Sequence, residues 1–291
     1  MRVLGFAGSA RRWGNSELVV RQVLRGARDE GAEIALVRLT DLRIERCTGC
    51  MRCAIGEQPC PLDDDMAWLM DTMQAADGAV LAAPTYWLGP AAAVKLVLDR
   101  LLMLTARLAD RFPPPRPAVT VVTAGLAEWR GITLPYLNAL VSAFGYRPIA
   151  SLAAIAPGPG EVLLDDGLMA RLLAAGRRLG RGELEPEPAA PGVCPTCHND
   201  AFTLHGETAS CPICARQATM RHDDAGVHLE FLPEEQAGHR WTPERLREHI
   251  EEWVVATGPR FIARRAEIKA RRAAYREVDI EWLRPPRGEE L

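Results

Sequence analysis

Lysine, aromatic side chains and long apolar runs are all scarce in this sequence. Two of the 35 basic residues are lysine, Lys95 and Lys269, and aromatic residues make up 6% of the 291 positions. The most apolar stretch, residues 91–104, contains Lys95, Asp99 and Arg100 and is too short to cross a bilayer. The first residues, MRVLGFAGSARR, lack the apolar core of a secretory signal. We therefore expect a cytoplasmic protein without a membrane partner.

A strong net charge is also absent, because 35 basic and 38 acidic residues give −3. Residues 183–259 carry 14 acidic and five basic side chains, which would repel a phosphate backbone. Residues 260–276 hold seven basic side chains and one acid, so a redox-sensing nucleic-acid-binding protein is an alternative of another class. Phe261, Ile268 and Tyr275 at seven-residue spacing indicate instead a helix that packs on something, such as a dimer partner. We do not expect nucleic acid as a partner.

All eight cysteines fall into two groups of four, and the first group occupies residues 47–60. Pairs of cysteines two residues apart in a reducing cytosol favour metal ligation over disulfides. The spacing C-x2-C-x2-C-x6-C resembles the run with which bacterial ferredoxins ligate a [4Fe–4S] cluster. A loop that holds zinc or no metal is the alternative. The expected cluster ligands are Cys47, Cys50, Cys53 and Cys60.

The second group has the spacing C-x2-C-x13-C-x2-C, in which two knuckles, CPTC and CPIC, flank a strand-like segment, residues 201–210. Four thiolates from two knuckles are typical of a structural zinc ribbon, although a rubredoxin-like iron would use the same ligands. Because four thiolates complete a tetrahedron, His198 and His205 are not expected to bind the metal. The expected zinc ligands are Cys194, Cys197, Cys211 and Cys214.

Short apolar runs alternate with amphipathic segments through the first 180 residues. This alternation predicts βαβ units and a doubly wound, five-stranded parallel sheet. The expected strands are residues 2–7, 33–39, 78–83, 118–123 and 148–155. The expected helices begin at Asn15 or Ser16 and end before Gly31, and then cover residues 66–75, 91–104, 134–144 and 166–179.

Composition changes divide the chain into four parts. Residues 1–182 form the α/β domain with its cysteine loop 47–60. Residues 183–192, ELEPEPAAPG, are expected to be a linker, because proline alternating with acid packs poorly. The ribbon covers residues 193–232. A C-terminal helical extension covers residues 233–291, with one helix beginning at Thr242-Pro243 and another from Pro259 to about Arg276.

The loop GSARRWGNS, residues 8–16, connects the first expected strand to the first helix. Doubly wound sheets bind ligands at the carboxyl ends of their strands, and a helix N-terminus there attracts phosphate. Ser9, Asn15 and Ser16 add donors to this loop, and Arg11 adds a cation. The loop has neither the lysine of a Walker A motif nor the pattern G-x-G-x-x-G, so it predicts a different phosphate-binding loop.

Four segments together resemble the NADPH-dependent FMN reductase family of flavodoxin-like proteins. They are Gly8-Ser9-x-Arg11 with Gly14-Asn15-Ser16, Asp63 to Met66, Pro84-Thr85-Tyr86-Trp87, and Lys95 with Asp99-Arg100. Within that family, the cysteine loop looks like that of the iron–sulfur flavoproteins. The resemblance implies a flavodoxin-like sheet, followed here by the small zinc ribbon and C-terminal helices.

The same resemblance implies one FMN per chain. The phosphate would bind Ser9, Arg11, Asn15 and Ser16; the ring and ribityl chain would border Pro84, Thr85, Tyr86 and Trp87; and Thr123, Ala124 and Gly125 would approach from the other side. The third segment, TAGLAEWRG, departs from the family's glycine-rich turn, and its Trp129 is a candidate lid. Lys95, Asp99 and Arg100 are expected to be structural.

FMN accepts two electrons and can release them singly, whereas a [4Fe–4S] cluster passes one at a time. We expect an FMN-dependent oxidoreductase of the iron–sulfur flavoprotein type, with no catalytic acid or base side chain. Its donor would be ferredoxin-like or NAD(P)H, and the sequence does not name the acceptor. The resemblance implies that the cluster of one subunit serves the flavin of a neighbour, hence a homodimer or higher homo-oligomer. The alternative is an NAD(P)H-dependent FMN or quinone reductase without a cluster.

Overall fold

The computed structural model describes residues 1–55, 58–104, 114–224, 226–233 and 238–276 of the chain. Two compact units, residues 1–247 and 248–291, divide it. The first unit contains both the α/β domain and the second cysteine group. The boundaries drawn from composition stay predictions.

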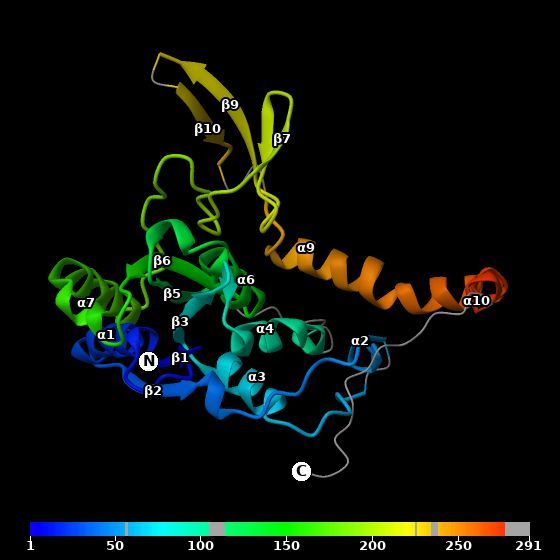
Figure 1. The fold of residues 1–291 in the computed structure, drawn as a ribbon, viewed down its shortest axis with the longest axis horizontal. Helices are drawn as coiled ribbons and strands as arrows, with labels where there is room; N and C mark the ends of the chain where they lie inside the picture. Colours follow the sequence, from blue (N-terminus) through cyan, green and yellow to red (C-terminus); the bar gives the residue numbers. More distant parts are fainter. Residues whose placement is uncertain (56–57, 105–113, 225, 234–237, 277–291) are drawn as a thin grey trace, which may run out of the picture. The chain divides into compact units, whose positions relative to one another are not determined.

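A parallel sheet with the strand order β2-β1-β3-β5-β6 forms the centre of the first unit (Figure 1). This order is that of flavodoxin-like domains, and it confirms the predicted doubly wound, five-stranded sheet. A short strand, β4 (Gly89–Pro90), pairs antiparallel with the end of β3. The parallel strands are β1 (Arg2–Ala7), β2 (Glu33–Arg38), β3 (Gly78–Tyr86), β5 (Arg116–Ala124) and β6 (Tyr146–Ile155).

Helices cover both faces of this sheet, as expected for βαβ units. Helices α1 (Asn15–Asp29) and α7 (Asp166–Gly180) pack together on one face. The other face carries α3 (Met66–Ala75), α4 (Ala92–Asp99) and α6 (Thr133–Ala143). The helix predicted over residues 91–104 is correct to Asp99, after which Arg100 interrupts it and a 3-10 turn (Leu101–Leu104) follows.

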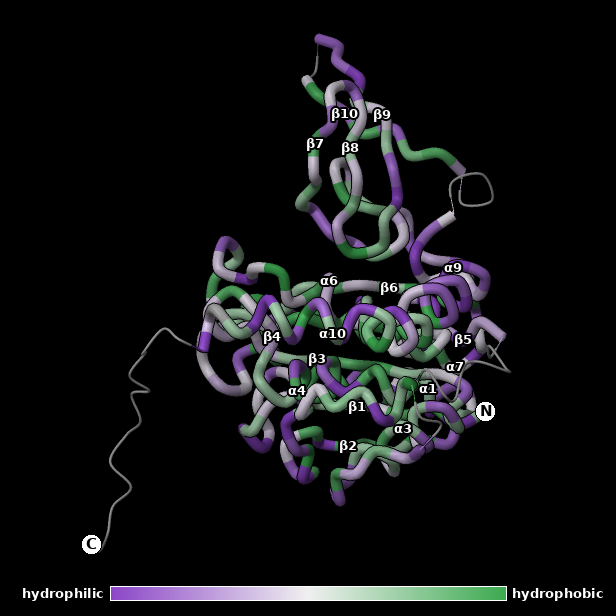
Figure 2. The backbone as a smooth tube through the Cα atoms, turned by 90° about the vertical axis from the view of Figure 1, so that its right-hand side faces the viewer, coloured by the Kyte–Doolittle hydropathy of each residue, from purple (hydrophilic) through white to green (hydrophobic). Residues whose placement is uncertain are grey.

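One core cluster lies between α1, α7 and the parallel sheet, and buried side chains of α3, α4 and α6 cover the other face. Figure 2 shows hydrophobic residues along the central strands of this sheet. Helices α1 and α7 touch through glycines. A Cβ atom on Gly26 would lie 2.3 Å from the carbonyl oxygen of Leu173, and one on Gly176 would lie 2.1 Å from that of Val23. The two backbones can approach this closely only because neither position carries a side chain.

Short turns complete the α/β domain. Helix α2 (Arg52–Ile55) lies inside the cysteine loop, and 3-10 turns follow β2, β5 and β6 at Leu39–Asp41, Ala127–Trp129 and Glu161–Leu164. Residues 183–192 have no regular secondary structure, yet their first half is held in place. Arg178 pairs with Glu183 and Glu187, and the Glu187 N–H donates to the Ile149 carbonyl of β6 at 2.8 Å.

An antiparallel sheet of order β10-β9-β8-β7 accompanies the second cysteine group. Two of its strands lie between the two cysteine pairs in the sequence, and the other two follow the second pair. Its strands are β7 (Thr203–His205), β8 (Thr208–Ser210), β9 (Gln217–Asp223) and β10 (Gly226–Phe231). Helix α9 (Pro243–Glu248) begins at the expected proline.

The second unit consists of helices in its described part. A π-helical turn (His249–Val255) precedes α10, which the structure describes over Thr257–Arg276 and which begins two residues before the predicted Pro259. Residues 234–237 and 277–291 of the predicted extension lie outside the described residues. None of the described helices combines the length and the apolar character that crossing a membrane requires.

Candidate functional site

A cavity of about 180 Å³ opens at the carboxyl ends of β1, β3, β5 and β6. It brings together the three loops that the sequence assigns to FMN, of which the first and the third lie more than 100 residues apart in the chain. Trp87 is the exception: its side chain is 93% exposed and does not line the cavity. The predicted contacts that do line it are Ser9, Arg11, Asn15, Ser16, Pro84, Thr85, Tyr86, Thr123, Ala124 and Gly125.

The loop after β6 also lines this cavity, and the sequence analysis missed it. Ala156, Pro157 and Pro159 contribute to the wall, together with Gly14 from the first loop. The signal was present, because residues 156–160 read APGPG directly after a predicted strand. Strands β5 and β6 are neighbours in the sheet, so their carboxyl ends must open into the same crevice.

The N-terminus of α1 lines the cavity and has no side-chain cap. Gly14 occupies the N-cap position and offers no oxygen to the first turn. Within the described part of the chain, the N–H groups of Ser9, Asn15 and Ser16 find no acceptor. Unpaired N–H groups at a helix N-terminus bind an anion, so this geometry suits the predicted phosphate.

A buried carboxylate stiffens the same loop from behind. Glu17 is 3% exposed and accepts hydrogen bonds from the Trp13 N–H, Arg21 and Arg38. Burial alone would raise the pKa of Glu17, but the Arg21 and Trp13 hydrogen bonds and the two guanidinium charges hold it below its ordinary value. Arg38 also donates to the Ala10 carbonyl at 3.0 Å. The loop is therefore held on its outer side, and the charge of Glu17 is compensated.

Two predicted phosphate ligands have further partners in the structure. The Asn15 amide donates to the carbonyls of Ala156 and Gly158 at 2.9 and 3.0 Å and accepts from the Gly160 N–H. Its side chain therefore clamps the loop after β6, and its backbone N–H is the group left for a phosphate. The hydroxyls of Ser16 and Thr123 lie 2.8 Å apart and are buried. One of these hydroxyls donates in that bond, so the proton of the other remains available to a ligand.

Exposed aromatic side chains lie on or close in sequence to the cavity-lining loops: Tyr86 lines the cavity, and Trp129 follows the cavity residue Gly125 by four positions. Tyr86 and Trp129 are each 53% exposed, and Trp129 ends the 3-10 turn after Gly125. Trp87 and Leu88 have φ angles of 50° and 67°, which are unfavourable for side chains of this size. The Leu88 carbonyl accepts from the Ile132 N–H at 2.9 Å, and this bond helps to hold the strained turn. The rim thus offers flat, apolar surface beside the cavity.

The first cysteine group lies in a largely exposed loop. Cys47 and Cys50 are exposed, whereas Cys53 and Cys60 are half-buried. A hydrogen bond from the Arg52 backbone lowers the pKa of Cys50, and burial raises that of Cys53. Among the described residues, these four thiols are not close enough together to ligate one metal ion. A four-iron cluster holds its ligands farther apart than one ion does, so the donor set still fits such a cluster.

A buried ion pair anchors both ends of this loop. The side chains of Arg100 and Asp64 are each 1% exposed and lie 2.6 Å apart. Arg100 also donates to the Glu45 carbonyl at 2.9 Å and to the Cys60 sulfur at 3.4 Å. Lys95 and Asp99 form the predicted i, i+4 pair on the exposed side of α4. Arg100 therefore places a positive charge next to an expected cluster ligand.

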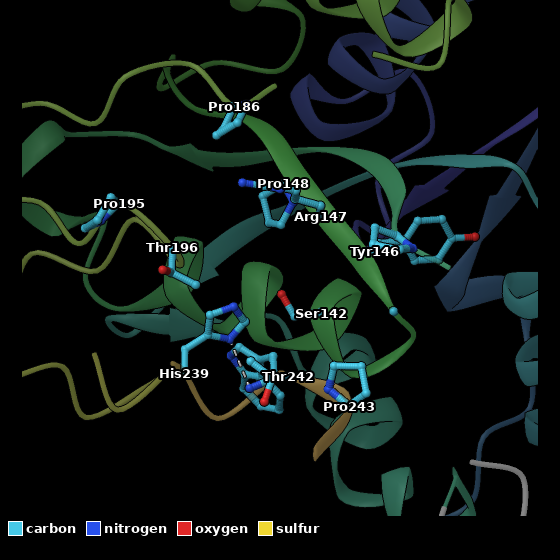
Figure 3. A pocket seen from close by; sticks show the side chains of 13 residues that line it. Ser142, Tyr146, Arg147, Pro148, Pro186, Pro195, Thr196, His239, Thr242 and Pro243 are labelled. Carbon is cyan, nitrogen blue, oxygen red and sulfur yellow. Dashed lines mark hydrogen bonds between the residues drawn. The ribbon is translucent and has the colours of Figure 1, made fainter. Parts of the chain in front are cut away.

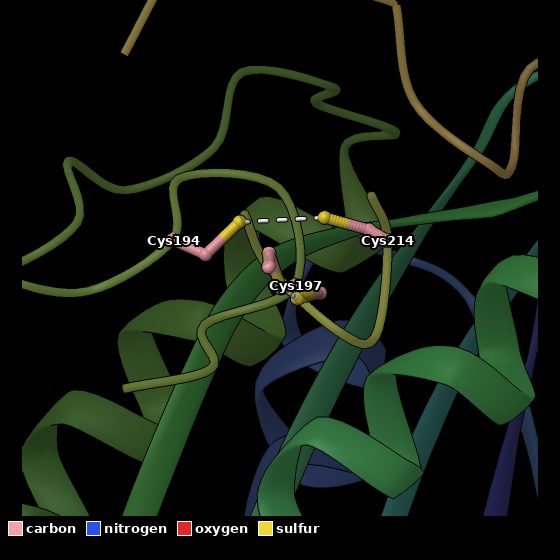
Figure 4. A group of neighbouring side chains, drawn as sticks. Cys194, Cys197 and Cys214 are labelled. Carbon is pink, nitrogen blue, oxygen red and sulfur yellow. Dashed lines mark hydrogen bonds between the residues drawn. The ribbon is translucent and has the colours of Figure 1, made fainter. Parts of the chain in front are cut away.

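The second cysteine group is assembled. All four thiols are buried, and their sulfur atoms lie within 4.8 Å of one another. Figure 4 shows Cys194 facing Cys214, whose sulfurs are 3.4 Å apart. Hydrogen bonding to Cys194 is the largest influence that raises the pKa of both Cys197 and Cys214, and a bound cation would offset the repulsion among four thiolates this close together. This donor set fits one tetrahedral metal ion.

Both knuckles share a backbone device. His198 and Ala215, each directly after a second knuckle cysteine, have φ angles of 55° and 66°. The turns close through bonds from the His198 N–H to the Cys194 carbonyl and from the Ala215 N–H to the Cys211 carbonyl, both 2.9 Å. The group of side chains that could hold a metal ion contains neither His198 nor His205. Burial lowers the pKa of His198, which keeps its ring neutral beside the thiols.

Known proteins with similar sequences agree with a flavin site in the α/β domain. The family described as NADPH-dependent FMN reductase matches residues 1–151. An iron–sulfur flavoprotein of Methanocaldococcus jannaschii is 38% identical over 100 residues, which are 34% of this chain and 51% of that protein. The chain thus spans about half of that relative's length. An iron–sulfur flavoprotein of Archaeoglobus fulgidus is 29% identical over 56% of this chain and 72% of its own length.

Two other proteins are similar along nearly the whole chain. The flavone synthase cfoJ of Aspergillus candidus is 28% identical over 87% of this chain and 88% of that protein. A solved flavone reductase has a TM-score of 0.75 at 22% identity and covers 98% of this chain and 100% of its own, which shows a common fold. From the family match over residues 1–151, at whose strand ends the cavity opens, the chain belongs to the NADPH-dependent FMN reductase family.

Proposed function

We propose that the chain is an iron–sulfur flavoprotein, with FMN in the cavity and a [4Fe–4S] cluster on Cys47, Cys50, Cys53 and Cys60. The observation that carries the proposal is the combination, in one α/β domain, of this cavity with a four-thiol loop whose Cys60 accepts from a buried arginine. Similarity to iron–sulfur flavoproteins of two archaea supports it. Electrons would pass between a ferredoxin-like donor or NAD(P)H and an acceptor that the residues do not specify.

When bound, FMN supplies both two-electron and one-electron chemistry, and the cluster supplies one-electron transfer. The side chains of this protein bind and orient these two cofactors. The free hydroxyl proton of Ser16 or Thr123 and the open N–H groups of α1 hold the phosphate. Tyr86 and Trp129 provide apolar surface that excludes water at the rim. The Arg100 guanidinium stabilises negative charge at Cys60.

We infer zinc in the second cysteine group, with a structural role. A Zn–S bond of about 2.3 Å places tetrahedral ligands about 3.8 Å apart. The observed sulfur separations of 3.3 and 3.4 Å and the limit of 4.8 Å lie on either side of that value. Thiol ligands in both groups need a reducing compartment, which supports the cytoplasm as the location.

A homodimer or higher homo-oligomer is part of the proposal. Cys47 and Cys50 are exposed, and a cluster bound there would contact water unless another surface covered it. A second copy of the chain would also bring a neighbouring flavin to that cluster. Nucleic acid is not proposed as a partner, since 14 acidic side chains dominate residues 183–259.

Analysis of anaerobically purified protein tests the whole assignment. We expect one FMN, one zinc, four irons and four acid-labile sulfides per chain, and a broad cluster absorbance beneath the flavin bands. Flavin and zinc without sulfide would remove the cluster from the assignment. Iron without sulfide, with the spectrum of a four-thiolate iron, would replace zinc by a rubredoxin-like site.

A second candidate is an NAD(P)H-dependent FMN reductase without a cluster that acts on a flat aromatic compound. The similarity to flavone synthase cfoJ extends over 87% of the chain, farther than the matches to iron–sulfur flavoproteins. The exposed Tyr86 and Trp129 would stack on such a compound. Anaerobic oxidation of the reduced flavin by a flavone or a quinone, in protein that lacks iron and sulfide, would favour this candidate.

A further inference from the structure

The first zinc knuckle contacts the flavin domain through a buried asparagine. Asn138 of α6 is fully buried and donates from its amide nitrogen to the Cys197 carbonyl at 2.7 Å. Its amide oxygen accepts from Thr120 of β5 at 2.5 Å and from Ser151 of β6 at 3.1 Å. The network thus runs from a metal-binding residue into β5, the strand whose end lines the flavin cavity.

A second contact joins the same knuckle to a different flavin loop. Asp200, three residues after Cys197, forms an ion pair with Arg130. The Arg130 carbonyl accepts from the Thr85 hydroxyl at 2.9 Å, and Thr85 lines the flavin cavity. Thr85 also bonds to the buried Thr133 at 2.8 Å, at the start of α6. Two cavity-lining segments, the end of β3 and the end of β5, therefore connect to the region of the first knuckle.

Elsewhere along this boundary the packing is loose. A cavity of about 210 Å³ separates Pro195 and Thr196 of the knuckle from Ser142 and Pro148 of the flavin domain (Figure 3). A pocket of this size has room for water, so its walls are not packed directly against each other. In the part of the chain that the structure describes, the contacts of Asn138 and Asp200 join the knuckle region to residues bonded to the flavin cavity.

We propose that Asn138 and Asp200 are positioning residues that make FMN binding depend on the metal in the four-cysteine site. The metal holds Cys197 in place, and this fixes the Cys197 carbonyl for Asn138 and the Asp200 carboxylate for Arg130. These partners in turn hold β5 and the end of β3, where Thr85 lies, in the FMN-binding arrangement. The inference rests on the proposed zinc and FMN but not on the cluster.

The test measures the dissociation constant for FMN in the full-length protein with zinc bound, after anaerobic removal by a chelator, and after zinc is restored. We expect the constant to rise about tenfold when zinc is removed and to return when zinc is added, a change of about 1.4 kcal/mol. Because coupling between binding sites is reciprocal, saturating FMN should tighten zinc binding to the four cysteines by the same factor.

Two variants and one control separate positioning from general stabilisation. In Asn138→Ala and in Asp200→Asn, FMN should bind more weakly with zinc present, and its dissociation constant should change less than threefold on zinc removal. Asp200 is exposed, so its variant is expected to fold even if the buried one does not. Glu230→Gln breaks the Arg221–Glu230 pair inside the ribbon and should keep the tenfold response.

Three results would overturn the inference, and they can be told apart. Zinc that binds without changing FMN affinity by more than twofold would show that the sites are independent. Variants that respond to zinc as the unmodified protein does would show that the ribbon acts through overall stability. Failure of the protein to bind zinc would remove the proposed metal and this dependence together.

Discussion

The buried pair of Asp64 and Arg100 offers the sharpest test of how the cysteine loop is held. The substitution Asp64→Asn removes one charge while keeping the shape of the side chain. Asp64 accepts from Arg100 at 2.6 and 3.2 Å and from the N–H groups of Glu45 and Met66 at 2.8 and 3.1 Å. The variant leaves the Arg100 guanidinium buried without a counter-ion.

Removing one partner of a buried ion pair costs about 3–5 kcal/mol of unfolding free energy. Because both side chains are 1% exposed, solvent does not screen this loss. In a unit of this size, the loss lowers the melting temperature by about 6–20 °C. Burial alone would raise the pKa of Asp64, but the Arg100 hydrogen bond and the two backbone bonds hold it below its ordinary value of 3.8. The stabilisation is therefore complete above about pH 4 and is lost as the pH falls through that lowered pKa.

Denaturant unfolding at pH 7 and at pH 3 measures this loss, and trypsin cleavage at Arg46 and Arg52 reports on the loop itself. The matched control is Asp99→Asn, which breaks the exposed pair with Lys95 and should cost less than about 1 kcal/mol. We expect faster loop cleavage in the Asp64 variant alone. A cost for Asp64→Asn no larger than that of the control would refute the claim that the pair anchors the loop.

Three further predictions concern the cofactor sites. Cys50→Ser should remove the broad cluster absorbance and acid-labile sulfide but keep the FMN bands; unchanged sulfide in the purified variant would contradict the cluster ligation. Ser16→Glu should abolish FMN binding, since a carboxylate would occupy the helix N-terminus, and stoichiometric FMN beside native circular dichroism would place the phosphate elsewhere. Replacing Cys197 and Cys214 by Ser should release zinc, whose binding contributes about 10–16 kcal/mol in isolated zinc-finger peptides, and expose residues 193–232 to protease. FMN should remain bound, about tenfold more weakly by the coupling energy worked out above, and a protease-resistant ribbon would refute the structural role.

Local sequence patterns were sufficient to predict the helices and strands of the sheet domain and the residues grouped at each expected cofactor site. The strands β1, β3 and β5 are apolar runs that are buried along most of their length, so their positions can be read from consecutive residues. The edge strand β2 is exposed or half-buried, yet its alternation with the helices is regular, and all five strands appear where the sequence predicts. The flavin residues follow from the rule that parallel strands present their carboxyl ends at one edge, which brings Ser16, Thr85 and Thr123 into one cavity. Spacing likewise grouped Cys194 with Cys197 and Cys211 with Cys214.

Tertiary structure alone decided what each of these side chains does. Asn15 looked like a phosphate donor, but its amide is used by carbonyls more than 140 residues away. Trp87 directly follows the cavity residue Tyr86 in the sequence, yet its backbone is left-handed and its side chain points into solvent. Arg100 was expected to be structural, but the sequence did not indicate its partner Asp64, which lies 36 residues earlier. The sequence by itself determined the sheet, the flavin loops and the two cysteine groups, because periodicity and spacing are local; the partners of the buried polar groups depend on contacts between distant segments, which no local pattern encodes.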